Sequence, residues 1–270
     1  MFFKDADNIL YDSHAHINSH EFDKDIDSIV LKARKASVVR IVDVGVNLES
    51  SKKSIELARK FPGRVFSTVG VDPDVVLPIS ELYDPNLELS SIFDKLSSLI
   101  EANREFVAGI GETGVDNFWL KKSALSVSEQ ESLLGKQIEL LDVHIELARK
   151  FDLPLTLHSR GYETELIEHL KNKGIRGIFH SYTGNYNTAR TILDSGFGLG
   201  INGIITFKNA EELRGMYKKV LGNQKISSPS DLYEKNLFLE TDSPYLSPNR
   251  GERNEPSQIA AIFEFISSNL

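Results

Sequence analysis

Short runs of apolar and β-branched residues recur along this sequence, and segments with a helical spacing of apolar residues separate them. The runs that we interpret as strands are Asn8–His16, Val38–Val46, Val65–Val71, Phe106–Glu112, Leu153–Ser159, Gly177–Tyr182, Gly196–Asn202 and Asn236–Asp242. Each run is followed by enough chain for a helix, as in parallel sheets whose strands are joined by crossover helices. Eight such units predict a (β/α)8 TIM barrel, and 270 residues suit one barrel domain over residues 1–270.

Apolar spacing and capping residues predict where individual helices lie. The first helix has apolar residues at i, i+3, i+4 and i+7, namely Ile26, Ile29, Val30 and Ala33. A longer helix is predicted over Ser128–Lys150, since Ser126 and Glu129 have the spacing of a capping box. The segments Leu77–Ser91 and Ile226–Asp231 are rich in Pro, Ser and acidic residues, so we predict loops with room for short turns of their own.

Four of the seven histidines lie at or just before predicted strand ends. In Asp12-Ser-His14-Ala-His16, the period of two along a strand sends residues 12, 14 and 16 to one face, which points inward in a barrel. His158 and His180 lie near the ends of two further strands. The C-terminal ends of barrel strands carry the chemistry of this fold, so these imidazoles are predicted to converge there. The remaining histidines fall in a loop and on helices and are predicted to be solvated or partly packed, namely His20, His144 and His169.

Two carboxylates, Glu112 and Asp242, end further predicted strands. Four imidazoles and two carboxylates are too many for one tetrahedral ion but suit two divalent ions about 4 Å apart, with Glu112 as the predicted bridge. The chain has no cysteine, so nitrogen and oxygen must hold any metal, which fits Zn²⁺, Mn²⁺ and, less naturally for imidazole, Mg²⁺. Asp12 and Glu240 precede His14 and Asp242 by two positions, and each is predicted as an acceptor behind a ligand or a buried structural carboxylate.

A glycine pattern, Gly109-x-Gly111-x-x-Gly114, matches a dinucleotide-binding fingerprint directly after a predicted strand. The helix that this fingerprint requires is not predicted, because helical spacing resumes only near Ser126. We therefore reject a nicotinamide site and expect the glycines to let the backbone approach the metals.

With these residues in place, the sequence resembles the TatD-related DNases, members of the metal-dependent amidohydrolase superfamily. The motifs that carry the resemblance span almost the whole chain, and they are Asp12-Ser-His14-Ala-His16, Gly109-Ile-Gly-Glu-Thr-Gly114, Pro154-Leu-Thr-Leu-His158-Ser-Arg160, His180 with Tyr182-Thr-Gly184, and Glu240-Thr-Asp-Ser-Pro-Tyr-Leu246 followed by Arg253-Asn-Glu-Pro256. The resemblance implies a first ion held by His14, His16, Glu112 and Asp242. It implies a second ion held by Glu112, His158 and His180, and a phosphodiesterase that trims DNA or RNA from the 3′ end.

The sequence departs from the family pattern at two places. In Val69-Gly-Val-Asp72-Pro73, Asp72 stands where the family usually has a histidine, and it is a candidate substrate-binding residue. An ionised carboxylate cannot donate to substrate phosphate and would repel it, unless it faces away or coordinates through water. The chain also stops soon after a predicted helix with Ile259, Ile262, Phe263 and Ile266, whereas relatives usually continue for another helical stretch, so a thinner closure of the barrel is expected.

The formal net charge of −8 opposes a polyanionic substrate at long range. The ions would offset this charge locally, together with basic residues predicted to follow strand ends, namely Lys121, Lys122, Arg160, Arg250 and Arg253. Arg160 and Arg253 are the predicted phosphate contacts. Asp242 is the candidate base that takes a proton from water activated by both ions.

Other functions remain open at this point. The same ligands would serve a hydrolase of a small ester, an amide or an aminoacyl-tRNA, and a non-enzymatic barrel that only binds metal is a further alternative. Lys4 interrupts the apolar start of the chain, and nowhere do eighteen apolar residues run together, so a cytoplasmic protein without membrane segments is expected. No obligate protein partner is evident.

Overall fold

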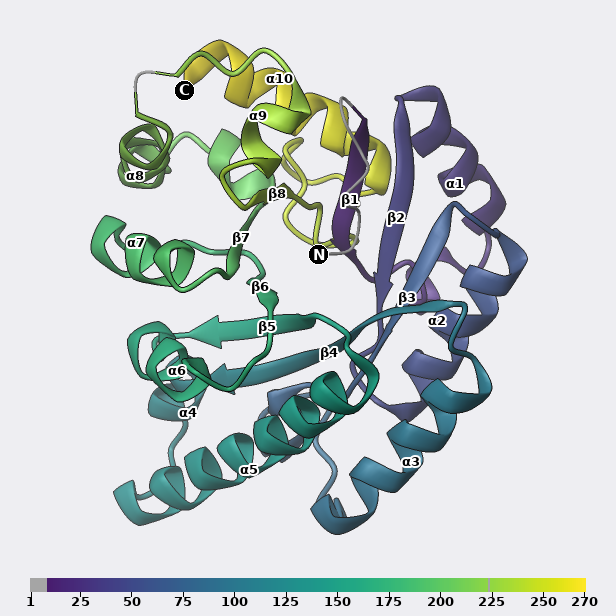
Figure 1. Cartoon of the computed structure of the whole chain (residues 1–270), viewed down its shortest axis with the longest axis vertical. Coiled ribbons are helices and arrows are strands. Elements are labelled where there is room, and N and C mark those ends of the chain that lie inside the picture. The colour runs from purple at the N-terminus through teal and green to yellow at the C-terminus, as the bar shows by residue number, and fades with distance from the viewer. Residues whose placement is uncertain (1–8, 223) are drawn as a thin grey trace.

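The computed structural model describes residues 9–222 and 224–270 of the chain. Eight parallel strands form one sheet in chain order and lie in the middle of the molecule, surrounded by helices (Figure 1). The strands are β1 (Leu10–Ala15), β2 (Val38–Val44), β3 (Val65–Val69), β4 (Val107–Asp116), β5 (Leu155–Arg160), β6 (Gly177–Phe179), β7 (Gly198–Ile201) and β8 (Leu237–Leu239). The predicted (β/α)8 barrel is thereby confirmed; Asn8, where the first predicted strand starts, lies outside the described residues.

Helices connect the strands and cover the outside of the barrel. They are α1 (Ile26–Lys35), α2 (Leu48–Lys60), α3 (Leu89–Ala102), α4 (Asn117–Lys122), α5 (Val127–Phe151), α6 (Glu163–Leu170), α7 (Tyr186–Asp194), α8 (Glu211–Leu221), α9 (Pro229–Tyr233) and α10 (Ile259–Asn269). Short 3-10 turns lie at η1 (His20–Phe22), η2 (Pro73–Val76), η3 (Gly203–Thr206) and η4 (Pro256–Gln258). Among the described helices, none is long and apolar enough to cross a membrane.

The helix predictions hold where the sequence carries both an apolar face and a cap. The predicted long helix is α5, and Ser126 and Glu129 form the expected capping box at its start. The predicted apolar face of α1 is confirmed for Ile29, Val30 and Ala33, which are buried. The loop predicted over Ile226–Asp231 contains the first residues of α9.

The glycine-containing strand β4 differs from its prediction. It was expected to end at Glu112, but it continues to Asp116, and α4 follows at once, so the expectation that no helix follows is wrong. Gly111 has a φ of +126°, and a Cβ there would lie 2.5 Å from the carbonyl oxygen of Thr156 in β5. The glycines thus let β4 pack closely on β5. They lie inside a strand, which excludes a dinucleotide-binding turn.

The barrel closes between β8 and β1 without a strand ladder among the described residues. Two backbone hydrogen bonds join the end of β1 to the segment beyond β8, from Asp242 N to His14 O and from His16 N to Ser243 O, each 2.8 Å long. The hydroxyl of Ser13 also donates to the carbonyl of Leu239. The C-terminal helix α10 packs against both strands and so covers this seam from outside.

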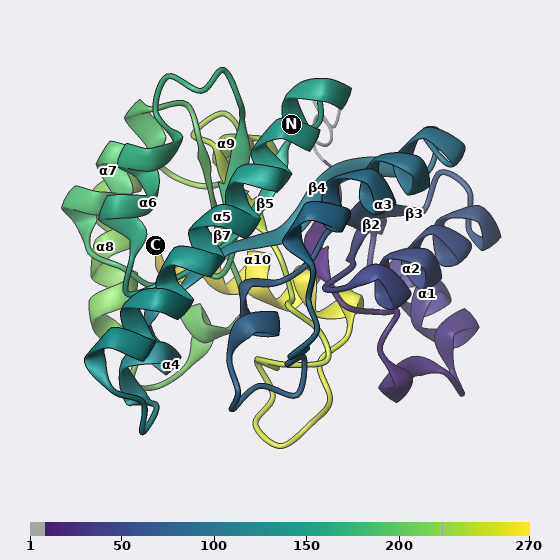
Figure 2. The ribbon, with the colours of Figure 1, turned by 90° about the horizontal axis from the view of Figure 1, so that it is seen from below.

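The loops that follow the strands gather at one end of the molecule. Figure 2 shows α4, the loop after β3 and the loop after β8 at this end. The ends of parallel barrel strands all point to the same rim, so side chains that are far apart in the sequence meet there.

Candidate metal centre

The six predicted metal ligands converge at the C-terminal ends of the strands. They lie on β1, β4 and β5 or directly after β1, β6 and β8, and they are His14, His16, Glu112, His158, His180 and Asp242. The cluster is sunk below the surface, because His14 is fully buried and Asp242 is only 9% exposed. Asp242 adopts a left-handed backbone with φ of +56°, a conformation that Asp tolerates, and this turns the chain after β8.

Four donor atoms form the first half of the cluster. The Nε2 atoms of His14 and His16 are 3.1 Å apart, and they lie 3.4 Å and 3.6 Å from Oε2 of Glu112. Oδ1 of Asp242 lies 3.7 Å from Nε2 of His14 and 3.4 Å from Nε2 of His16. Four ligands about 2.1 Å from a tetrahedral ion stand about 3.4 Å from one another. The spacing of these atoms therefore fits one ion.

Three donor atoms form the second half. Oε1 of Glu112 lies 3.0 Å from Nδ1 of His158 and 2.8 Å from Nε2 of His180, and these two nitrogens are 3.2 Å apart. Glu112 therefore directs one oxygen to each half of the cluster. This is the arrangement of a carboxylate that bridges two ions, and nitrogen and carboxylate donors suit divalent metals. The residues present fit the metal centre that the sequence predicts.

Hydrogen bonds behind the cluster fix which nitrogen faces inward for two of the four imidazoles. Nδ1 of His16 lies 3.1 Å from the carbonyl oxygen of Val44, which leaves Nε2 for the cluster. Nε2 of His158 lies 3.0 Å from Oδ2 of Asp116, which leaves Nδ1 for the cluster. Such outer carboxylates orient a metal-binding histidine and raise its basicity. Asp116 also accepts from Trp119 N through its other oxygen and so caps α4.

Sequence reasoning missed Asp116. The predicted strand ends at Glu112, whereas β4 extends to Asp116. Residues 114 and 116 therefore lie outside the strand that the sequence predicts. Asp116 is 1% exposed, and in the β4–β5 ladder it lies opposite Arg160 while Gly114 lies opposite His158. A signal was present in the motif Gly114-Val-Asp116, since 112, 114 and 116 share a face of an extended chain.

The charges of the cluster are set by burial and by mutual contact. Burial alone would raise the pKa of Glu112, but the imidazoles of His180 and His14 outweigh it and hold this pKa well below its usual value. Asp242 is likewise held low, since the imidazole of His16 outweighs its burial. Burial lowers the pKa of His180 to about 4, so this imidazole is neutral and can offer a lone pair.

The imidazole of His16 behaves differently from that of His180. Burial would lower the pKa of His16, but its hydrogen bond to Asp242 and the charge of Glu112 raise it to about 9. The pKa of His158 is also raised well above its usual value, because Asp116 and Glu112 outweigh burial. Protons thus balance the carboxylates in the metal-free protein, and ions that bind the same nitrogens would displace them.

Asp12 and Glu240 accept hydrogen bonds from backbone N–H groups. Within the described residues, neither forms a hydrogen bond or an ion pair with an imidazole. Asp12 accepts from His14 N at 3.2 Å, from Thr241 N at 2.9 Å and from Thr241 Oγ1 at 2.5 Å. Glu240 accepts from the backbone N–H of Ser181, next to His180. Burial raises the pKa of Asp12 to about 7 and that of Glu240 well above its usual value. Of the two predicted roles, the geometry favours the structural one, in which each carboxylate anchors a segment that bears a ligand.

Two predicted phosphate contacts already have protein acceptors. Arg160 donates to the backbone oxygen and to the hydroxyl of Ser181, both at 3.0 Å. Arg253 forms an ion pair with Asp25 at 2.5 Å and lies 4.4 Å above the ring centroid of Phe22. Their contact with substrate phosphate stays a prediction. Lys121 and Lys122 end α4 and do not lie in a loop as predicted, and both of them and Arg250 are exposed.

His144 was predicted to be solvated or partly packed, and this is wrong. It is completely buried, where its Nε2 accepts from Val71 N at 2.9 Å and its Nδ1 bonds the carbonyl of Leu140 at 2.7 Å. Burial lowers its pKa to about 4, so it is a neutral structural residue. Its backbone partner Val71 immediately precedes Asp72, and His144 therefore supports the start of the loop after β3.

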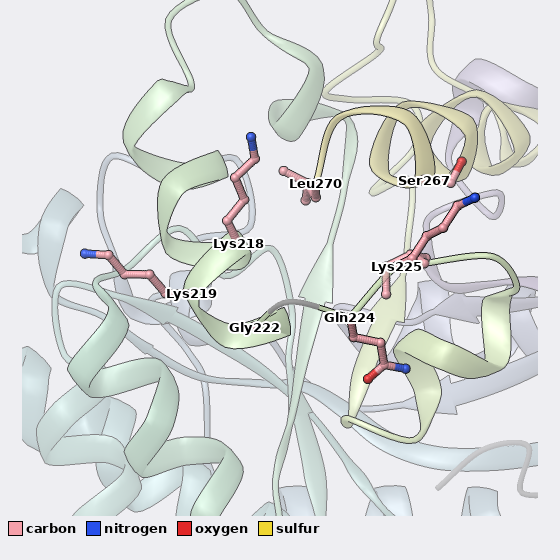
Figure 3. A pocket seen from close by; sticks show the side chains of 8 residues that line it. Lys218, Lys219, Gly222, Gln224, Lys225, Ser267 and Leu270 are labelled. Carbon is pink, nitrogen blue, oxygen red and sulfur yellow. The ribbon is translucent and has the colours of Figure 1, made fainter.

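A cavity of about 670 Å³ lies away from the metal centre. It is lined by the ends of α8 and α10 and the segment between them, including Lys218, Lys225, Ser267 and Leu270 (Figure 3). Helices of a barrel run antiparallel to the strands, so these helix ends lie at the opposite rim. None of the residues that line this cavity is a histidine or a carboxylate side chain, and lysines near a helix C-terminus are explained by the helix dipole.

Comparison with known proteins places this geometry in a family. The model of the TatD related DNase family matches residues 11–269. A metal-dependent hydrolase of Bacillus subtilis, YabD, is 30% identical over 264 residues, covering 96% of this chain and 90% of the relative. TATDN3 of Mus musculus, named as a candidate deoxyribonuclease, is 29% identical over 259 residues, covering 96% of this chain and 80% of the relative.

A solved structure shares the fold. The crystal structure of YjjV, a TatD homologue from Escherichia coli K12, superposes with a TM-score of 0.76 at 24% identity, covering 96% of this chain and 89% of the homologue. The family model extends over nearly all of the barrel, including every predicted ligand. The chain therefore belongs to the TatD-related DNase family of metal-dependent hydrolases.

Proposed function

We propose that this protein is a phosphodiesterase that removes nucleotides from the 3′ end of DNA with two divalent ions as cofactor. The observation that carries the proposal is that the two carboxylate oxygens of Glu112, Oε1 and Oε2, face two separate groups of potential metal ligands. Paired ions about 4 Å apart are typical of enzymes that cleave phosphodiesters. The deoxyribonuclease name of the mouse relative supports the choice of DNA.

The seven donor atoms divide between two ions. His14, His16, Asp242 and Oε2 of Glu112 would hold the first, and His158, His180 and Oε1 of Glu112 the second. When bound, the two ions would act as Lewis acids that lower the pKa of water and stabilise charge on the phosphoryl oxygens.

Asp242 is the proposed general base. Its pKa lies below its usual value, so the carboxylate is ionised at neutral pH and ready to accept a proton. It is the most exposed carboxylate of the cluster, at 9% against 3% for Glu112, so water and substrate can reach it. Glu112 supports the reaction by holding both halves of the centre at a fixed separation.

Side chains around the mouth are suited to a nucleic acid. Trp119 on α4 and Tyr245 after β8 are 47% and 58% exposed, and the ring of Tyr245 lies 6.5 Å from that of His16. Bases of single-stranded nucleic acid stack on exposed aromatic rings, and nearby lysines attract the phosphates. Lys122 stands beside this aromatic surface, with Nζ 5.3 Å from the centroid of Trp119.

The test is incubation of end-labelled single-stranded DNA, double-stranded DNA and RNA with Mg²⁺, Mn²⁺ or Zn²⁺, with a chelator control. We expect stepwise loss from the 3′ end of DNA that needs the metal and weakens as salt rises. Absence of phosphodiester cleavage with every metal, together with turnover of an ester, amide or aminoacyl-tRNA substrate, would move the assignment to those substrates. Metal binding without any hydrolysis would indicate a binding protein.

A further inference from the structure

A third carboxylate lies beside the second half of the metal centre. The segment that follows β3 packs directly on β4, since a Cβ on Gly70 would lie 2.5 Å from Cα of Gly111 and 2.9 Å from the carbonyl oxygen of Glu112. Val71 turns the other way, into the hydrophobic core. Side chains of an extended chain alternate, so Asp72 returns to the side on which Gly70 faces Glu112.

Hydrogen bonds hold Asp72 in this place. Its backbone N–H donates to the carbonyl of Val46 at 2.9 Å, and its Oδ1 accepts from Asp74 N at 2.8 Å. The side chain is 5% exposed, and within residues 9–222 and 224–270 no hydrogen bond to Oδ2 is formed. Oδ2 of this nearly buried carboxylate is therefore open to water or to an ion that the protein itself does not supply.

The charges that surround Asp72 favour a cation. Its carboxylate interacts electrostatically with Glu112 and His158, which both belong to the second half of the centre. Burial and the like charge of Glu112 raise the pKa of Asp72 well above its usual value. Two buried carboxylates side by side are unfavourable unless a proton or a cation lies between them.

We propose that Asp72 is an oxygen ligand of the second ion and that it shifts the metal preference of this position toward Mn²⁺ relative to Zn²⁺. The inference rests on the two-ion centre of the proposed function. Without Asp72, the second ion has two nitrogens and one oxygen from the protein, a set that suits tetrahedral Zn²⁺ with a water. A second carboxylate makes the donors harder and raises the coordination number, and both changes favour Mn²⁺. The sequence predicts that Asp72 binds substrate. In this proposal it binds the metal cofactor instead.

The test is a calorimetric titration of the metal-free protein with MnCl₂ and, separately, with ZnCl₂. Asp72→Asn keeps the acceptor for Asp74 N–H and removes the charge. We expect one of two Mn²⁺ sites to weaken by about tenfold to a hundredfold, with a smaller loss for Zn²⁺. Asp84→Asn is the matched control, because Asp84 accepts from Asn86 N in the same kind of turn but is exposed. Unchanged Mn²⁺ affinity, or equal losses for both metals, would overturn the inference.

A second variant keeps the test decisive if Asp72→Asn does not fold. Asp72→His replaces the oxygen donor with a nitrogen donor, so we expect it to retain Zn²⁺ and to bind Mn²⁺ at least about tenfold more weakly. A variant that prefers Mn²⁺ as strongly as the natural protein does would contradict the proposal. Failure of the natural protein to bind any divalent ion would instead reject the two-ion centre on which the proposed function depends.

Discussion

Two seams of the barrel carry five of the six predicted metal ligands, and the chain holds the two seams together in different ways. Between β4 and β5 the strands pair along a ladder that places Gly114 opposite His158 and Asp116 opposite Arg160. Between β8 and β1 the connection depends on Asp12, whose carboxylate accepts from Thr241, and on two backbone hydrogen bonds between the end of β1 and the segment after β8. One seam is built by regular strand pairing, and the other by buried polar side chains.

The difference affects what an ion contributes at each seam. His158 is positioned by its strand and by Asp116 before any ion binds. Asp242 lies three residues beyond β8, and its donors face His14 and His16 across the seam. An ion at the first position would therefore join two ends of the sheet that share no ladder in the described part of the chain. In the proposed two-ion centre, this ion would close the barrel as well as serve the reaction.

Glu112 joins the two seams, and its substitution is expected to have the largest effect. Glu112→Gln removes the charge that both halves share, so we expect turnover to fall by at least about a thousandfold, since several kcal/mol of charge stabilisation depend on the ions. Metal analysis after dialysis should show fewer bound ions than in the natural protein. Glu139→Gln, the same change on an exposed position of α5, is the control. Two bound ions in Glu112→Gln would show that the bridge is dispensable.

Asp242 tests the reaction at the β8–β1 seam. Asp242→Asn keeps an oxygen that can face His14 and His16 but cannot accept a proton, so we expect a fall in turnover of about a hundredfold to ten-thousandfold. The measurement pairs single-turnover cleavage of labelled DNA with metal content. Near-normal rates with both ions bound would remove Asp242 as the base.

Asp116 tests the β4–β5 seam with a smaller expected effect. Asp116→Asn can still cap α4, but it replaces the carboxylate that forms a hydrogen bond with Nε2 of His158 by an uncharged amide. We expect one ion to bind about tenfold to a hundredfold more weakly while the other is unchanged, measured by calorimetry. An unchanged melting temperature of the metal-free protein would show that the cap is intact. Equal weakening of both ions would mean that the seams are not independent.

Proton release on metal binding tests the protonation state of the metal-free cluster. The pKa of His16 is raised to about 9, above its ordinary value, so this imidazole carries a proton in the metal-free protein at pH 7 and must lose it when an ion binds. Apparent affinity for the first ion should therefore rise about tenfold for each pH unit between 7 and 9. Calorimetry in buffers of different ionisation enthalpy measures the release. Binding that is independent of pH over this range would contradict the assignment.

The sequence predicted the barrel and the convergence of the six candidate ligands because both depend on local patterns. Alternation of strand and helix signals defines the fold, and the rule that strand ends share one rim gathers histidines from distant segments. The sequence-based prediction failed for interactions that arise from tertiary packing. The length of β4 depends on how Gly111 and Gly114 fit against β5. Asp116 belongs to the candidate site only because β4 extends that far. His144 has a backbone partner in another element, which no periodicity reveals.

The smallest expected effect compares one buried threonine at each seam. Thr241→Val removes the hydroxyl that donates to Oδ2 of Asp12 and leaves that oxygen buried without its donor, which costs about 1–3 kcal/mol. Thr156→Val in β5 is the matched change, because within the described residues the buried Thr156 hydroxyl has no hydrogen-bond partner, so its loss should be neutral or stabilising. Urea unfolding of both metal-free variants at pH 8, above the pKa of about 7 for Asp12, measures the difference. Equal free energies of unfolding would show that the Asp12–Thr241 contact does not hold the β8–β1 seam, which would leave its closure to the backbone bonds of His14 and His16.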